Sequence, residues 1–230
     1  MKKKFLSIVL FLIFTTKAIA HLGDYNDINF LKYELFRNNK SIGHHTYSFE
    51  RTDGVLKVSS VIDFKISKLG VDIYKYTGTT QEEYNSNQLI KFLSKTNQNK
   101  KIKITEIALN KKKDNLIISG SENQLISPKE YPVGTWWNHE IVQAKAQISG
   151  VSGRIIEQEV IFLGKEKLNL YGKDYKALHF NFKSTDQSLP KNKKLDIDVW
   201  YQEETNLWLK ASFDKTGSWE YRLKNIKKKN

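Results

Sequence analysis

The chain has 230 residues, no cysteine and a formal net charge of +13. The absence of cysteine excludes disulfide bonds, thiol catalysis and a lipid-modified N-terminal cysteine. Twelve Phe, eleven Tyr and five Trp, against only three Pro, favour a folded domain over a disordered chain. The length fits one domain with a substantial core, which must be stabilised by packing alone.

The N-terminus has the three parts of a secretory signal peptide. Lysines at residues 2–4 precede an apolar run over residues 5–14, and small residues follow at Ala18 and Ala20. The apolar run is shorter than the ~20 residues that a membrane anchor needs. We therefore predict a signal peptide over residues 1–20, a single β domain over residues 21–230, no transmembrane segment after cleavage, and a periplasmic or secreted location. Four lysines leave with the leader, which lowers the net charge from +13 to +9.

Runs of aromatic and β-branched residues recur along the chain, separated by Asn, Asp and Gly. The pairs Asn38-Asn39 and Asp53-Gly54 have the local chemistry of hairpin turns. This pattern predicts an all-β antiparallel meander that forms a strongly curved sheet or incomplete barrel. The predicted strands span residues 28–37, 41–51, 56–69, 71–84, 89–96, 102–109, 116–120, 154–163, 168–171, 175–183, 195–201, 207–213 and 218–223.

Two stretches depart from the simple strand pattern. The second half of the strand predicted over residues 71–84 is rich in Thr and Glu, so we expect it to face water or the mouth of a cavity. Residues 121–150 interrupt the rhythm of strands with two prolines. The spacing of Ile141, Val142 and Lys145 predicts a short helix over residues 138–148. We expect this segment to cross or cap an end of the sheet.

The histidines raise one metal hypothesis. Cleavage after Ala20 would leave an N-terminal His21, and an N-terminal histidine can bind copper when a second histidine is near. The available second ligands are His44, His45, His139 and His179. Neighbouring residues of a strand point to opposite faces, so His44 and His45 are not expected to bind one ion together. We rank this copper protein third among the possible functions and predict no metal and no cofactor.

The sequence contains no convincing catalytic group. The segment Gly150-Val151-Ser152-Gly153 lacks the full spacing of a nucleophile elbow and is better explained as a turn. The adjacent pairs Glu82-Glu83 and Glu203-Glu204 are expected to be solvated, because neighbouring carboxylates do not lie across a substrate. We therefore predict no catalytic residues and a non-enzymatic role.

Aromatic residues carry the remaining binding hypothesis, because a curved sheet can enclose an apolar ligand while a few polar groups fix its orientation. The alternative for each of them is that it simply fills the core. The predicted ligand-binding residues are Tyr74, Tyr76, Trp136, Trp137, Trp200 and Tyr201.

The basic charge has two interpretations. Lysines gather in short groups at residues 100–101, 111–113, 191–194 and 227–229. They can draw the protein to an anionic lipid or polysaccharide surface, or they can be solvated residues that discourage aggregation of strand edges. Nucleic acid would also suit basic and aromatic surfaces, but the predicted export argues against it, and we predict no nucleic-acid partner.

Five motifs stand out along the chain: residues 33–45, residues 71–76, Trp136-Trp137-Asn138, residues 198–201 and residues 217–223. Together they resemble a family of exported bacterial proteins known only as a domain of unknown function. In this chain Asn39 stands where the family more usually has Gly. The resemblance covers almost the whole predicted mature chain. It implies a periplasmic all-β protein, broadly similar to the curved half-barrel sheets of lipoprotein carriers, with no known activity.

These observations lead to one preferred function and one alternative. The first is non-catalytic binding of an apolar or amphipathic molecule of the cell envelope, such as a lipid or a lipoprotein segment. The alternative is a structural or interaction protein of the envelope that contacts anionic lipid or polysaccharide.

Overall fold

The structure is a computed structural model that describes residues 25–120, 124–190 and 193–229. The predicted signal peptide, residues 1–20, lies outside these described residues. Fourteen strands form a single sheet. They are β1 (Ile28–Arg37), β2 (Lys40–Thr52), β3 (Val55–Lys68), β4 (Val71–Asn85), β5 (Gln88–Gln98), β6 (Lys101–Asn110), β7 (Asn115–Ser119), β8 (Leu125–Pro128), β9 (Ala146–Ile148), β10 (Ile155–Leu170), β11 (Lys173–Ser184), β12 (Asp196–Gln202), β13 (Trp208–Asp214) and β14 (Ser218–Lys228).

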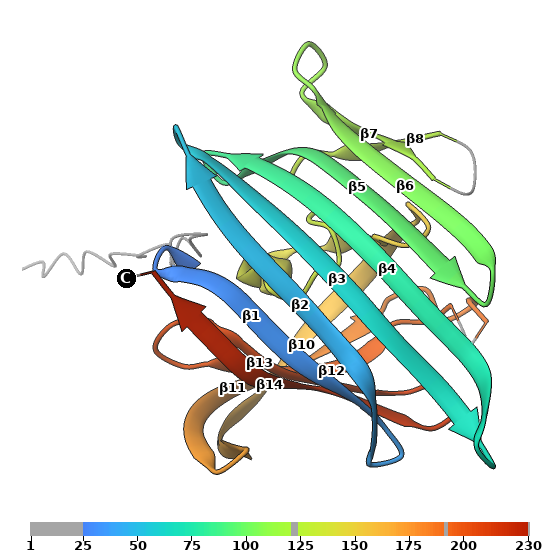
Figure 1. Cartoon of the computed structure of the whole chain (residues 1–230). Coiled ribbons are helices and arrows are strands. Elements are labelled where there is room, and N and C mark those ends of the chain that lie inside the picture. Colours follow the sequence, from blue (N-terminus) through green and yellow to red (C-terminus); the bar gives the residue numbers. More distant parts are fainter. Residues whose placement is uncertain (1–24, 121–123, 191–192, 230) are drawn as a thin grey trace, which may run out of the picture.

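The strands follow a meander with one long-range pairing. Their order in the sheet is β8-β7-β6-β5-β4-β3-β2-β1-β14-β13-β12-β11-β10-β9. The first and last strands, β1 and β14, are therefore neighbours at the middle of the sheet, and all ladders are antiparallel (Figure 1). Among the described residues no ladder joins the edge strands β8 and β9, so the sheet stays open. The predicted all-β curved meander is confirmed.

Tight turns explain why the strands pair in this order. Six hairpins have two-residue loops in which both residues have positive φ, the geometry of a type I′ turn. Asn38 (φ 49°) and Asn39 (φ 60°) form the first of them, so asparagine here does what glycine does elsewhere. The other five turns are Asp53-Gly54, Leu69-Gly70, Ser86-Asn87, Asn99-Lys100 and Tyr171-Gly172.

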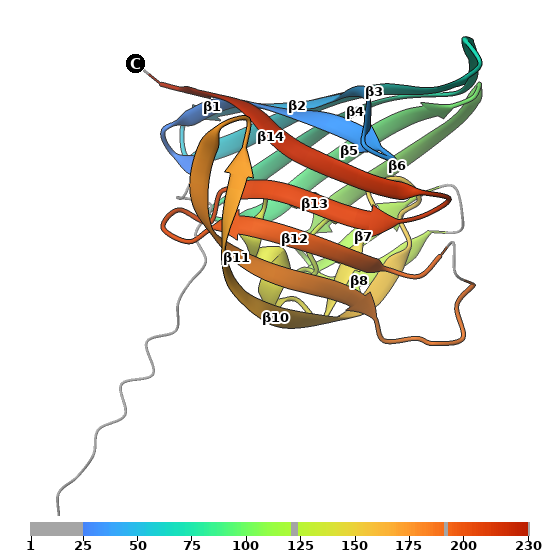
Figure 2. The same ribbon diagram turned by 90° about the horizontal axis from the view of Figure 1, so that it is seen from below.

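The sheet bends so that its two halves face each other across the core (Figure 2). We call β1–β8 the first wing and β9–β14 the second wing. The connection between β8 and β9, residues 129–145, runs between the wings, and we call it the crossing segment. Its two tryptophans contact different wings. Trp137 packs edge-on against Phe49 and Tyr84 of the first wing, and Trp136 packs against Trp208 and Tyr221 of the second.

The structure corrects three local predictions. The helix predicted over residues 138–148 is only a 3-10 helix, η2 (His139–Gln143), followed by strand β9. Ile141 is fully buried, and β9 pairs with β10. The apolar spacing that resembled a helix therefore reflects contacts with the rest of the fold. Strand β8 was not predicted. The two strands predicted over residues 154–163 and 168–171 are one strand, β10, because a bulge at Gly164 (φ 133°) lets the ladder with β11 continue.

The helical content of the fold is small. Within the part of the chain that the structure describes, no helix has both the length and the apolar character needed to cross a membrane.

Candidate ligand-binding site

A cavity of about 210 Å³ lies between the inner face of strands β2–β5 and the crossing segment, and it is partly open to solvent. The loop after β9, through Gly150 and Val151, completes one wall. Its lining side chains come from both wings and from the crossing segment: His45, Tyr47, Ser60, Ile62, Tyr76, Thr80, Phe92, Ser94, Thr96, Thr135, Trp136, Val151 and Tyr221.

Small residues in two neighbouring rows of the sheet explain why the interior is hollow here. Ser60, Thr80 and Ser94 are cross-strand partners in one row, and Gly78 and Thr96 are partners in the next. On one side the following row brings Glu82 opposite Phe92, and on the other side Tyr76 lies opposite Phe64. The side chains of these rows share the inner face of the sheet. The small residues therefore form the floor of the cavity, and the larger residues of the two outer rows border it.

A chain of hydrogen-bonding groups crosses the floor of the cavity. His45 Nε2 lies 3.2 Å from Ser60 Oγ, which lies 2.7 Å from Thr80 Oγ1. At the other end His45 Nδ1 lies 3.5 Å from the Tyr47 hydroxyl, a longer and weaker contact. A neutral imidazole has one donor and one acceptor nitrogen. The chain can therefore run in either direction, and Thr80 can offer a ligand either a donor or an acceptor.

The protonation state of His45 follows from its surroundings. The His45 imidazole is surrounded by protein, except on the side where it lines the cavity and is partly accessible. Desolvation by this burial, together with the neighbouring His44, lowers the pKa of His45 to about 3. The imidazole is therefore neutral at neutral pH, and the polar floor carries no net charge.

The remaining walls are aromatic. Tyr76, Phe92, Trp136 and Tyr221 line the cavity. Burial raises the pKa of Tyr76 to about 12, so its hydroxyl stays protonated at neutral pH. Among the described residues that line the cavity there is no Lys, Arg, Asp or Glu. The arrangement suits an uncharged group with one hydrogen-bonding end.

Glu82 anchors the crossing segment beside the cavity. Its carboxyl group accepts a hydrogen bond from the Tyr84 hydroxyl at 2.7 Å and one from Trp137 Nε1 at 3.2 Å. The side chain is only 1% exposed, so the prediction that Glu82 is solvated was wrong. Glu82 belongs to the inward-facing row with Val58 and Phe92. Its carboxyl group made an outward-facing position the expected one. Desolvation raises the pKa of Glu82 to about 7.

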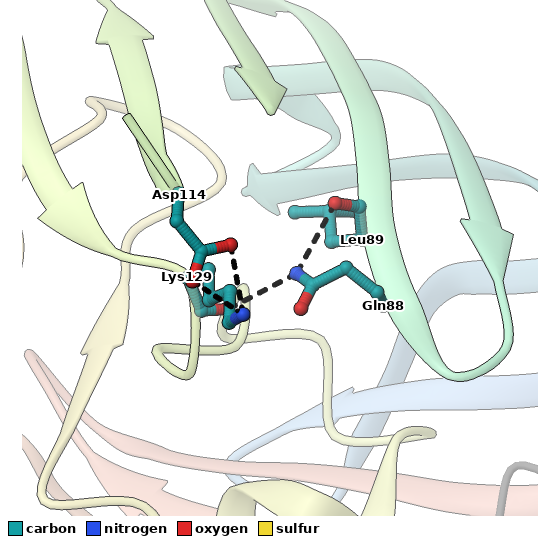
Figure 3. A network of polar contacts seen from close by, with 4 residues as sticks. All are labelled: Gln88, Leu89, Asp114 and Lys129. Carbon is teal, nitrogen blue, oxygen red and sulfur yellow. Dashed lines mark hydrogen bonds and ion pairs between the residues drawn. The ribbon is translucent and has the colours of Figure 1, made fainter. Parts of the chain in front are cut away.

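A second set of polar contacts fixes the beginning of the crossing segment (Figure 3). The Lys129 ammonium forms an ion pair with Asp114, in the turn between β6 and β7, at 2.6 Å. Gln88 Nε2, at the start of β5, donates to the Lys129 carbonyl at 3.2 Å and to the Leu89 carbonyl at 3.3 Å. A turn and the first residue of a strand in the first wing therefore hold the segment as it leaves β8.

The six aromatic residues proposed from the sequence lie in different places. Tyr76 and Trp136 line the cavity. Tyr74 lies beyond it, 6.1 Å from Phe64 between ring centroids. Trp137 is fully buried behind the cavity, against the Glu82 carboxyl.

The other two of the six belong to β12 and point to opposite faces of the sheet. The Tyr201 hydroxyl donates to the Trp136 carbonyl at 2.9 Å and so positions a wall residue. Trp200 lies on the outer face, where its ring stacks on His179 at 4.1 Å and its indole N–H donates to Glu166. Trp200 therefore does not line the cavity.

The polar floor was not predicted as a site. The one signal for it was the Thr-rich second half of β4, which we expected to face water or a cavity mouth and which contributes Thr80. His45 was considered only as a copper ligand. His44 and His45 do lie on opposite faces, with His44 beside Asp63 and His45 beside Ile62. His21 lies outside the described residues, and within them no group of three His, Asp or Glu side chains could hold a metal ion.

A larger hollow of about 490 Å³ lies at the ends of β11, β12 and β13. Its lining carries both signs of charge, through Lys183, Asp196, Asp214 and Lys215. Such a surface favours water and ions over an apolar group. The smaller, uncharged cavity therefore fits the predicted ligand class better.

A known protein family matches most of the chain. Residues 33–224, most of the sequence, match the family model described as Domain of unknown function (DUF6134). The chain belongs to this family. A search of the curated proteins finds no match. Membership agrees with the resemblance inferred from the motifs, and it brings no activity with it, so the function has to be argued from the site.

Proposed function

We propose that this member of the DUF6134 family binds a small apolar or amphipathic molecule, or a short apolar portion of a lipid, without transforming it chemically. The cavity beneath Trp136 carries the proposal, because it combines aromatic walls with a single chain of hydrogen-bonding groups. Binding sites of this kind are mostly apolar and use a few polar groups to orient the ligand.

The state of the lining groups supports an uncharged binding portion. His45 is neutral at neutral pH, and burial raises the pKa values of Tyr47, Tyr76 and Tyr221. A charged ligand group would be desolvated in the cavity without a counter-charge, which is strongly unfavourable. A hydroxyl, ester or amide would instead meet Thr80 at the end of the polar chain.

The size of the cavity limits the ligand further. Its volume of about 210 Å³ is below the ~300 Å³ at which sites for drug-sized molecules begin. A whole phospholipid does not fit. The proposed ligand is therefore a single ring or a short acyl segment, either free or as the end of a larger envelope molecule that extends through the open side.

The envelope setting of this proposal rests on the signal-peptide pattern of residues 1–20. Native mass spectrometry of protein purified without detergent tests export and ligand binding in one experiment. We expect a mass that lacks residues 1–20 and an additional bound species that organic extraction removes. A full-length chain would contradict export, and an empty protein would contradict a retained ligand.

A direct binding test uses an uncharged single-ring probe, 4-fluorobenzyl alcohol, whose binding is followed by fluorine NMR. Ile62 lines the cavity, whereas its neighbour Val61 lies on the outer face and is 48% exposed. The substitution Ile62→Phe places extra volume in the cavity, and Val61→Phe is the matched control. We expect Ile62→Phe to weaken probe binding at least tenfold, which corresponds to about 1.4 kcal/mol, and Val61→Phe to leave it unchanged. Equal binding by both folded variants, checked by circular dichroism, would reject this cavity as the site.

A further inference from the structure

The turn between β3 and β4 exposes a group of apolar side chains. Leu69, at the turn itself, is 95% exposed, the highest value among the large hydrophobic residues that the structure describes. Val71 is 64% exposed and Ile73 is 54% exposed. We call these three residues the apolar tip. The hairpin that carries it projects past the ends of the neighbouring strands (Figure 1).

The backbone makes Leu69 an unusual choice at this position. Its φ of 51° lies in the left-handed region, which disfavours bulky side chains. Four of the other two-residue turns place Asn, Asp or Ser first. The fifth places Tyr171 first, and its hydroxyl donates to Glu34 at 2.8 Å. Leu69 is instead held in a strained conformation with its side chain in solvent, which the stability of the fold does not explain.

Lysines surround the apolar tip. Lys65, Lys68 and Lys75 belong to the same hairpin, and all three are exposed. The neighbouring turn adds Lys100 and Lys101. On the same hairpin the acidic residue Asp72 is paired with Lys65 at 3.1 Å. The tip therefore combines exposed apolar groups with an excess of positive charge.

Hydrogen bonds fix the two turns relative to each other. Asn99, in the turn between β5 and β6, donates through its backbone N–H to the Lys75 carbonyl at 2.9 Å. Its side-chain oxygen accepts from the Lys75 N–H at 2.9 Å, and its amide donates to the Ile73 carbonyl at 3.3 Å. The lysines at residues 100–101 therefore follow directly on a residue that is held against Ile73, at the base of the apolar tip.

We propose that the apolar tip docks on the surface of an anionic lipid bilayer. Leu69, Val71 and Ile73 enter the boundary between head groups and acyl chains, while the surrounding lysines contact lipid phosphates. Combined apolar and cationic groups are what interfacial membrane binding requires. An anionic polysaccharide would meet the same lysines but would leave the three apolar side chains in water. Lipid is therefore the partner that uses the whole surface.

The absence of cysteine allows a direct test of depth. The substitution Leu69→Cys, labelled with an environment-sensitive fluorophore, places one probe at the tip. Lys112→Cys is the control, because it lies in the turn between β6 and β7, at the opposite end of the strands. On vesicles of equal parts phosphatidylcholine and phosphatidylglycerol we expect a blue shift for the label at residue 69 and none at residue 112. No shift at either position, or equal shifts at both, would overturn the proposal.

Vesicle co-sedimentation separates the apolar and charged contributions. We expect the combined substitutions Leu69→Asn, Val71→Thr and Ile73→Thr to weaken binding at least tenfold, about 1.4 kcal/mol. Asn at residue 69 suits the left-handed conformation, so folding is preserved. Ile126→Thr, at another exposed apolar residue, is the matched control. Undiminished binding by the tip variant would reject the inference.

The charge is tested with two pairs of lysines. The double substitution Lys68→Gln with Lys100→Gln should weaken binding more than Lys111→Gln with Lys112→Gln, which removes the same charge from the opposite end. Equal losses would show attraction by net charge alone and would overturn docking by the tip. Competition by a soluble anionic polysaccharide, with no effect of the apolar substitutions, would assign the lysines to polysaccharide instead. None of these readouts depends on the cavity being occupied.

Discussion

The two wings bury their inner faces in different ways. In the second wing the inner side chains are large or closely packed, and Phe182, Val199, Trp208 and Ala211 are fully buried. In the first wing the middle rows contain Ser60, Ser94 and Thr96, which are equally buried but small and polar. Both wings follow the same alternation of residues. The comparison shows that alternation decides which side chains point inward, while their size decides whether the interior is solid or hollow.

The largest expected effect comes from the residue that joins the first wing to the crossing segment. Trp137→Ala removes a fully buried indole and leaves Glu82 without one of its donors. We expect a loss of about 3–5 kcal/mol in the free energy of unfolding, measured by urea denaturation. Trp136→Ala should be less costly, because one side of Trp136 borders the cavity. A larger loss for Trp136→Ala would contradict this account of the hollow wing.

Enlarging a small inner residue in each wing tests the comparison directly. Ala211→Leu adds volume where Val199 and Tyr221 are the cross-strand neighbours, and overpacking should destabilise the protein by about 1–3 kcal/mol. Ser94→Val adds volume at the cavity and should change stability by less than ~1 kcal/mol. Thermal unfolding of the two variants measures the difference. Similar losses would mean that the first wing has no usable space.

A smaller effect is expected from the titration of Glu82. Its pKa is raised from 4.5 to about 7 in the folded protein, so the folded state binds the proton more tightly than the unfolded state. The stability contributed by this proton is complete below the unfolded pKa and is lost as the pH rises through the folded pKa. Between about pH 5.5 and about pH 7.5 we expect a loss of about 2 kcal/mol.

The variant Glu82→Gln provides the control for that titration. Glutamine resembles the protonated acid, can accept from Trp137 Nε1 and can donate to the Tyr84 hydroxyl. Its unfolding free energy should therefore lack this component of the pH dependence, as measured by urea denaturation across the same range. An identical slope in both proteins would assign the dependence to other groups.

Local chemistry made most of the fold predictable. Hairpins depend on residues that tolerate positive φ, and pairs such as Asn38-Asn39 and Asp53-Gly54 are visible in the sequence. The errors arose where distant contacts decide the structure. Gly164 lies in the ladder between β10 and β11, where two separate strands were predicted, and η2 is short because β9 pairs with β10.

The site was less predictable, because it depends on which rows lie opposite each other. The aromatic content pointed to Tyr76 and Trp136, but it pointed equally to Trp200, on the outer face. A serine such as Ser60 has no special signal in sequence. It becomes part of a site only when Thr80 lies opposite it and the crossing segment covers both.

The pairing of β1 with β14 has a consequence for how the protein is made. Tyr33 pairs with Leu223, so the middle of the sheet joins residues from the two ends of the chain. The hairpins of the first wing can form from neighbouring sequence during synthesis, but β1 keeps one unpaired edge until the last strand has emerged. Contacts of such large sequence separation slow folding and leave an exposed strand edge in the meantime. The centre of the finished sheet is thus the last part to close, and a chain that loses β14 would lose the join between the two wings.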